Sequence, residues 1–80
     1  MRHEIKMANL GYDMEAGKIG SWLKAVGDDV RRGEPIVEVE TDKSAVEMES
    51  LTTGTLVEIV SDVGVEVAVG EVIGYIESPD

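Results

Sequence analysis

The sequence predicts an all-β domain of short antiparallel strands packed in two layers, and three observations support this. Val, Ile, Leu and Met are plentiful and Phe is absent, and a β-branched bias favours sheet over helix. Short runs of alternating apolar and polar residues are separated by glycine-rich turns. The chain also repeats itself, because "GDDVRRGEPIVEVE" (27–40) and "GVEVAVGEVIGYIE" (64–77) share Gly, Val, Gly, Glu, Ile and Glu in register.

The turn residues set the order of the predicted strands. The first strand is "HEIKM", followed by the loop "ANLGYDMEAG". In "KIGSWLKAVG" the apolar positions Ile19, Trp22 and Val26 suit a strand; Leu23 gives a helical spacing too, but Gly20 inside the run argues for a strand. The turn-rich segment "GDDVRRGEP" comes next. Later strands are expected at "IVEVE", "AVEMES", "GTLVEIVSDVG", "VEVAVGE" and "VIGYIE".

The repeat covers most of the chain when each residue is aligned with the residue 37 positions later. Two copies are too few for a solenoid. We therefore expect two half-sheets that are related by a pseudo-twofold axis and packed face to face. The repeated glycines are expected to adopt positive φ at the turns. The aligned glycine pairs are Gly17 and Gly54, Gly27 and Gly64, and Gly33 and Gly70.

Length and composition restrict the functions that this chain can have. Its 80 residues fit one small domain, expected at residues 1–77, with 78–80 as the start of a linker. The formal charge is −10, from 7 basic and 17 acidic residues, which disfavours nucleic acid and anionic membranes and favours a basic protein partner. The absence of cysteine and of a signal-peptide pattern leads us to expect a cytoplasmic protein.

The junction between the two halves, "TDKS" at residues 41–44, holds an unusual turn. A two-residue hairpin favours Asn-Gly or Asp-Gly, whereas this one has Asp42-Lys43. Asp42 suits a turn, but Lys43 gives it no comparable help. An exposed amine at a hairpin tip can enter another protein's active site and take an amide-linked group. With a pKa near 10.4 the amine needs an enzyme to activate it. The alternative is an ordinary solvated turn lysine.

At this point the chain resembles the lipoyl domains of the dihydrolipoyl acyltransferases of 2-oxo acid dehydrogenase complexes. The resemblance covers nearly the whole chain. It is carried by "EVETDK", by "KMANLGYDMEAGKIGSWLKAVGDDVRRGEPI" and by "GVEVAVGEVIGYI". It implies a flattened barrel-sandwich of two four-stranded antiparallel sheets, with the lysine at one end and both termini at the other. Ala8 and Ser44 depart from the Pro and Ala that are usual in the family.

The resemblance also implies roles for individual residues. Lys43 is then the attachment site of lipoic acid, with Glu40, Asp42 and Ser44 read by the modifying enzyme. Two groups of residues are expected to recognise a partner. The second group is expected to do so because it places an acidic field around the arm. The two groups are Leu10, Gly11 and Tyr12 in the loop, and Glu38 and Glu47 on the strands.

The function implied is that of a swinging arm rather than an enzyme. The lipoyl group carries acyl groups and electrons between active sites, and the domain is expected to be a monomer within a longer acyltransferase chain. Its implied partners are a thiamine-dependent 2-oxo acid decarboxylase, a dihydrolipoyl dehydrogenase, and a lipoate-protein ligase or lipoyl/octanoyl transferase. No catalytic residue is expected, since the single histidine, His3, lies near the terminus, and no metal site is expected.

Two other functions remain open from the sequence. Biotin carboxyl carrier domains share this fold and modify a hairpin lysine, but Met flanks that lysine on both sides, where this chain has Asp42 and Ser44. An unmodified barrel-sandwich module could instead serve as an adaptor.

Overall fold

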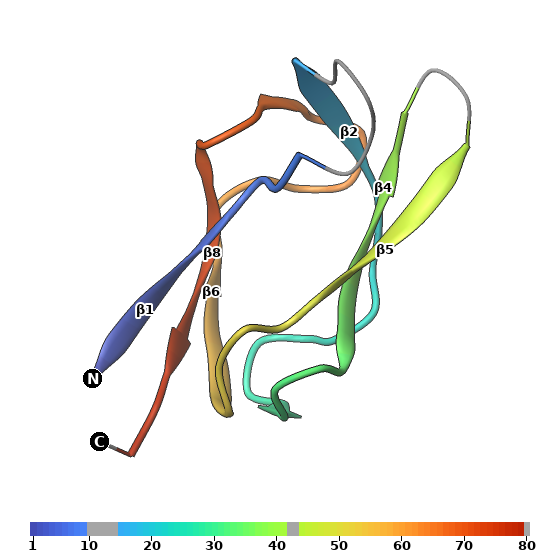
Figure 1. The fold of residues 1–80 in the computed structure, drawn as a ribbon. Helices are drawn as coiled ribbons and strands as arrows, with labels where there is room; N and C mark the ends of the chain where they lie inside the picture. Colours follow the sequence, from blue (N-terminus) through green and yellow to red (C-terminus); the bar gives the residue numbers. More distant parts are fainter. Residues whose placement is uncertain (10–14, 42–43, 80) are drawn as a thin grey trace.

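The computed structural model describes residues 1–9, 15–41 and 44–79. Its strands form two four-stranded antiparallel sheets (Figure 1), called sheet A (β1-β8-β6-β3) and sheet B (β5-β4-β2-β7). This confirms the predicted fold class. The described part contains no helix that could cross a membrane. The strands are β1 (Arg2–Lys6), β2 (Ala16–Trp22), β3 (Asp29–Val30), β4 (Pro35–Glu40), β5 (Ala45–Glu49), β6 (Gly54–Ile59), β7 (Glu66–Ala68) and β8 (Val72–Glu77).

The strand predicted at "KIGSWLKAVG" is wrong in its second half. β2 ends at Trp22, and the next residue, Leu23, still donates its N–H to the carbonyl of Ile36 at 2.9 Å. The chain then leaves sheet B to reach β3 in sheet A. Val26 lies on this connection, outside the space between the two sheets, and is therefore exposed.

The predicted arrangement of one half-sheet per repeat is also wrong. β1 and β3 belong to sheet A, whereas β2 and β4, from the same half of the sequence, belong to sheet B. The second half follows the same rule, so each sheet takes two strands from each half. Among the described strands, every connection between consecutive strands crosses from one sheet to the other except the connection of β4 to β5. The halves are therefore interleaved rather than stacked.

The pseudo-twofold relation itself is visible in the backbone hydrogen bonds. Gly27 donates its N–H to the carbonyl of Leu56 at 2.7 Å, and Gly64 donates to Ile19 at 2.8 Å. Both glycines have positive φ, as do Gly33 and Gly70, which confirms the prediction for these two pairs. Glycine is favoured here because a side chain strains this backbone conformation.

The same prediction is wrong at Gly54, which begins β6 and does not have positive φ. It is glycine for another reason: a Cβ atom there would lie 2.3 Å from the carbonyl oxygen of Glu77. Gly54 therefore sets how closely β6 approaches β8 at the start of their pairing, where its neighbour Thr55 faces Glu77.

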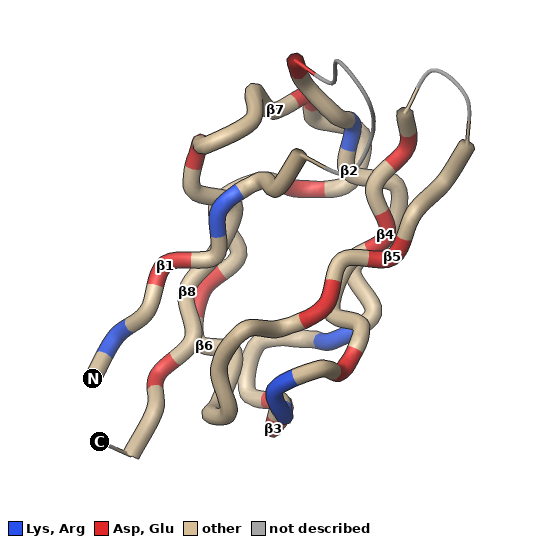
Figure 2. Tube along the Cα trace, in the orientation of Figure 1, with Lys and Arg blue, Asp and Glu red and all other residues tan. Residues whose placement is uncertain are grey.

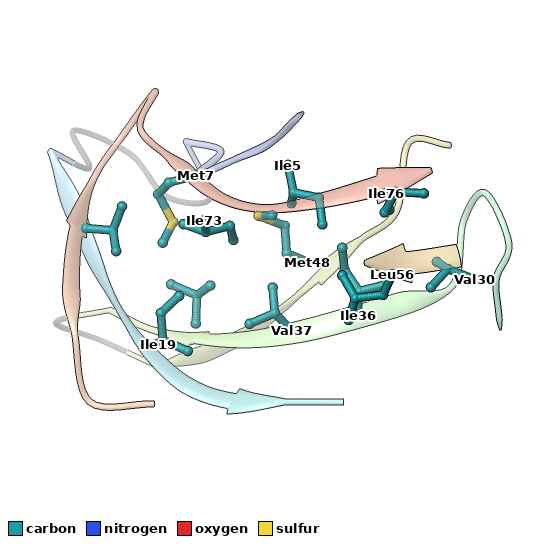
Figure 3. Packing of buried hydrophobic residues seen from close by; sticks show 12 residues of the cluster. Ile5, Met7, Ile19, Val30, Ile36, Val37, Met48, Leu56, Ile73 and Ile76 are labelled. Carbon is teal, nitrogen blue, oxygen red and sulfur yellow. The ribbon is translucent and has the colours of Figure 1, made fainter. Parts of the chain in front are cut away.

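The core lies between the two sheets and is almost wholly aliphatic (Figure 3). Residues that the repeat aligns are buried together, as with Ile19 and Leu56, or Ile36 and Ile73. Met7 and Met48 also fill the core. The buried cluster consists of Ile5, Met7, Ile19, Val30, Ile36, Val37, Val39, Met48, Leu56, Val67, Ile73 and Ile76.

Trp22 is half-buried and packs against this core, as expected for a packing residue. Its indole N–H donates to the carbonyl of Ser61 at 2.8 Å, so its one polar group is satisfied. A Cβ atom at Gly74 would lie 3.3 Å from the edge of the Trp22 ring. The small residue on β8 thus leaves room for the large one on β2.

The turn before β4 is closed by the side chain of Glu34. Its carboxylate accepts the backbone N–H of Arg31 at 2.7 Å and lies 3.5 Å from the Nζ of Lys24. The hydrogen bond from the Arg31 backbone is the main cause that lowers the pKa of Glu34 below its ordinary value. This turn fixes the start of the strand that leads to the lysine.

Replacing a glycine that allows close approach of two strands should destabilise the domain by a different amount than replacing a glycine with positive φ. Gly54→Ala should destabilise the domain by more than about 3 kcal/mol, because its Cβ overlaps backbone that cannot move without breaking the register of β6 and β8. Gly64→Ala should cost about 1–2 kcal/mol, since nothing lies within 4 Å of its Cβ and only the conformation is strained. Urea unfolding measures both, and an equal or smaller cost for Gly54→Ala would contradict this reading.

Candidate functional site

The β4–β5 hairpin is anchored in the core at its base. Val39 faces Val46 and Val37 faces Met48 across the pair. Val37, Val39 and Met48 are buried, and Val46 is half-buried, in agreement with the alternation of the sequence. A one-residue slip would turn this apolar set outward, so burial fixes the register.

The outer end of the hairpin is closed by Thr41 and Ser44. The N–H of Thr41 donates to the carbonyl of Ser44 at 2.8 Å. The hydroxyl of Thr41 donates to the same carbonyl at 2.8 Å and accepts the N–H of Ser44 at 3.2 Å. Asp42 and Lys43, the two residues between them in sequence, lie outside the described residues. Sequence reasoning missed Thr41, although its place beside the lysine and its short hydroxyl side chain were visible there.

The closed end of the hairpin lies away from both termini (Figure 1). At the far end β8 and β1 are joined in the same manner, since Ser78 donates its N–H to the carbonyl of Met1 at 2.8 Å. The N-terminal amine of Met1 in turn donates to the carbonyl of Ser78 at 2.8 Å. The pseudo-twofold axis therefore relates the hairpin end to the paired termini.

The outer face of sheet B is acidic next to the hairpin. Glu38 and Glu47 face each other directly across β4 and β5, and Figure 2 shows acidic positions along both strands. The basic residue on β2 is Lys18, whose backbone partner is Glu40. No ion pair is found for Glu38, Glu40 or Glu47 within the described part of the chain.

The outer face of sheet A is neutralised at the corresponding place. Arg2 forms an ion pair with Glu58 and also stacks over the ring of Tyr75, 4.4 Å from its centroid. Like charges that face each other across strands are destabilising, and opposite charges are stabilising. The two faces thus differ in charge although the backbone repeats. On sheet B, which carries the lysine hairpin, Glu38 and Glu47 have no ion-pair partner among the described residues.

Of the residues expected to be read by a modifying enzyme, the structure describes Glu40 and Ser44. Both are exposed. The Glu40 side chain lies across β2, where a Cβ atom at Gly20 would be 3.1 Å from its Cγ and Oε1 atoms. Both residues are therefore open to a partner and lie at the same end of the hairpin.

The loop expected to recognise a partner falls on Leu10, Gly11 and Tyr12, which lie outside the described residues. The described chain resumes at Glu15, whose carbonyl accepts the N–H of Val69 at 3.0 Å. β2 then starts beside the hairpin end, because Lys18 pairs with Glu40. The end of the loop is therefore held close to the end of β4.

The other possible sites among the described residues lie away from the hairpin end. The described residues hold no group of three or more His, Cys, Asp or Glu that could bind a metal ion. A groove of about 90 Å³ between edge strands β1 and β5 is lined by Ile5, Met48 and Leu51 among others, with no residue of the hairpin end. His3 contacts the hydroxyl of Ser78 at 3.0 Å, near the termini. The candidate site is a protrusion rather than a pocket.

Comparison with known proteins agrees with this geometry. The family model described as "Biotin-requiring enzyme" matches residues 3–76. The lipoyl domain of the 2-oxoglutarate dehydrogenase complex from Azotobacter vinelandii shares 33% identity with a TM-score of 0.74, over 94% of this chain and 95% of that one. The chain belongs to the lipoyl domain family. It is thus a non-catalytic carrier domain.

Similar sequences also belong to acyltransferases. The succinyltransferase component of the 2-oxoglutarate dehydrogenase complex of Bacillus subtilis is 45% identical over 73 residues, 91% of this chain and 18% of that protein. Acetyltransferase component 2 of the mitochondrial pyruvate dehydrogenase complex of Arabidopsis thaliana is 51% identical over 71 residues, 88% of this chain and 13% of that protein. The lipoyl domain thus spans less than a fifth of these relatives.

A solved structure of lower identity supports the fold alone. The urea carboxylase of Kluyveromyces lactis gives a TM-score of 0.80 at 19% identity, over 96% of this chain and 6% of that one. The higher identities to acyltransferases and to a lipoyl domain favour a lipoyl carrier over a biotin carrier.

Proposed function

We propose that Lys43 carries lipoic acid and that the domain is the swinging arm of a longer 2-oxo acid dehydrogenase acyltransferase. The observation that supports this most is the β4–β5 hairpin, the connection that stays within one sheet. Its base is fixed in the core and its end is closed by Thr41 and Ser44. In sequence, Lys43 falls between the two residues that close this end of the hairpin.

Attachment would form an amide between the Nζ of Lys43 and the carboxyl carbon of lipoic acid. The amine must first lose a proton, because it is protonated at neutral pH, and the leaving group of an activated acyl donor departs. A lipoate-protein ligase or a lipoyl/octanoyl transferase would supply that donor. We propose that this enzyme reads the exposed side chains of Glu40 and Ser44, together with Asp42.

The attached dithiolane would then carry substrate. When attached, the group would supply a disulfide that can accept an acyl group together with two electrons from a thiamine-dependent decarboxylase. It could then give the acyl group to coenzyme A and the electrons to a flavin-dependent dihydrolipoyl dehydrogenase. The chain has no cysteine, so none of its own thiols can exchange with the arm. Tethering raises the effective concentration of the arm at nearby active sites.

The acidic face of sheet B is proposed to help choose the decarboxylase. Glu38 and Glu47 retain an unfavourable cross-strand pair, whereas sheet A pairs its charges. Charged surfaces of this kind act chiefly on encounter rate and specificity. The loop residues Leu10, Gly11 and Tyr12 are proposed to add contacts to the same partner.

Intact-mass spectrometry after co-expression with a lipoate-protein ligase tests the modification. We expect one lipoyl group on the wild-type domain and none on Lys43→Arg, because arginine keeps the positive charge but cannot be acylated by the ligase. A biotin mass would show a biotin carrier instead. An unmodified wild-type domain would favour an adaptor module and contradict the proposal.

Charge reversal of Glu47→Lys should separate stability from partner choice. It converts a repulsive pair with Glu38 into an attractive one, so stability should rise by about 0.2–1 kcal/mol, less at high salt. Reductive acylation by the cognate decarboxylase should become slower, with the effect reduced by salt.

Glu4→Lys is the matched control, since it changes the net charge equally on β1 in the other sheet. Its acylation rate should stay near that of the wild type. An unchanged rate for Glu47→Lys, or an equal loss in both variants, would contradict a role for the acidic face.

A further inference from the structure

We infer that Thr41 is a positioning residue for acylation of Lys43, acting through its hydroxyl on Ser44. The inference rests on the proposed function and adds a residue that the motif reading did not include. It starts from the hydrogen bonds that close the hairpin, all of which join Thr41 to the main chain of Ser44.

The hydroxyl of Thr41 takes the place of a main-chain carbonyl that normally accepts a hydrogen bond in such a turn. In a regular two-residue hairpin the two flanking residues exchange both of their N–H···O=C bonds. Here the N–H of Thr41 makes the first of these bonds at 2.8 Å. The N–H of Ser44 instead reaches the hydroxyl of Thr41 at 3.2 Å, and the hydroxyl also donates to the carbonyl of Ser44 at 2.8 Å. Both main-chain polar groups of Ser44 are therefore held by one side chain.

The turn needs such help because of its sequence. Asp42-Lys43 lacks the Asn-Gly or Asp-Gly that favours a tight hairpin. A side chain that bonds nearby backbone can stabilise a turn in place of an intrinsic preference. The hydrogen bonds of Thr41 thus compensate for the unfavourable turn sequence that follows it.

The pseudo-twofold relation provides an internal comparison. Ser78 stands at the end of β8 as Thr41 stands at the end of β4, and its hydroxyl also points to a carbonyl, that of Met1, at 3.4 Å. A hydroxyl therefore recurs at this strand end, with a longer contact where the two strands are not joined by a turn. The shorter contact, in which the hydroxyl both donates and accepts, is found at the end of β4, the strand that precedes Lys43.

The consequence is kinetic. A modifying enzyme that binds a lysine between two fixed residues loses less conformational freedom than one that must order the turn itself. Loss of the hydroxyl should therefore slow acylation, and it should leave the core unchanged because Thr41 lies beyond the buried part of β4.

The test measures the steady-state kinetics of a lipoate-protein ligase on the 80-residue chain, with lipoate and ATP. Thr41→Val removes the hydroxyl and keeps the branched shape, and we expect kcat/KM to fall about tenfold with an unchanged thermal midpoint. Thr41→Ser should restore most of the rate, since Ser78 makes the equivalent contact. Ser78→Ala, at the far end, should be modified at the wild-type rate.

Wild-type kinetics for Thr41→Val, or equal losses in Thr41→Val and Thr41→Ser, would overturn the inference. If Thr41→Val does not fold, amide exchange in the wild type decides: the Ser44 N–H should be protected, and free exchange would overturn the inference. A wild-type chain that is never modified would instead refute the proposed function, so the two failures are distinguishable.

Discussion

Interleaving of the two halves is the constraint on which the rest of the structure depends. The chain crosses between the sheets at every connection of described strands except that of β4 to β5. Two of the crossings are tied to a central strand of the other half, because Gly27 bonds to Leu56 and Gly64 bonds to Ile19. Neither half can bury its apolar residues without the other. A chain of 80 residues thereby forms one core without a disulfide.

The same constraint explains the position of the site. Connections that cross between the sheets run over the ends of the sandwich and close it. A hairpin within one sheet can instead project beyond the end of the sandwich. The β4–β5 hairpin is that exception, and Val37, Val39 and Met48 hold its base in the core. The proposed site thus lies where the two halves differ. The pseudo-twofold counterpart of the hairpin end is the pair of chain termini, joined through Met1 and Ser78.

The sequence predicted the fold class and most of the strands, because these follow from local alternation and turn glycines. The choice of Lys43 follows from one motif and stays a prediction. It could not predict that each sheet draws on both halves, since an internal repeat does not say which copies pair. Gly54 was misread because glycine meets two needs, positive φ and close approach of backbone, that look alike in sequence. The role of Thr41 depends on the positions of two main-chain groups, so only the structure could reveal it.

We propose that Lys43 becomes a substrate for modification only on the folded support, so that the local sequence alone does not suffice. The most direct measurement compares lipoylation of the intact domain with that of a synthetic peptide of residues 37–50, "VEVETDKSAVEMES". The peptide contains the hairpin from Val37 onward and lacks the core that fixes its base. The account predicts efficient modification of the domain and little of the peptide. Equal values of kcat/KM for the two would contradict it.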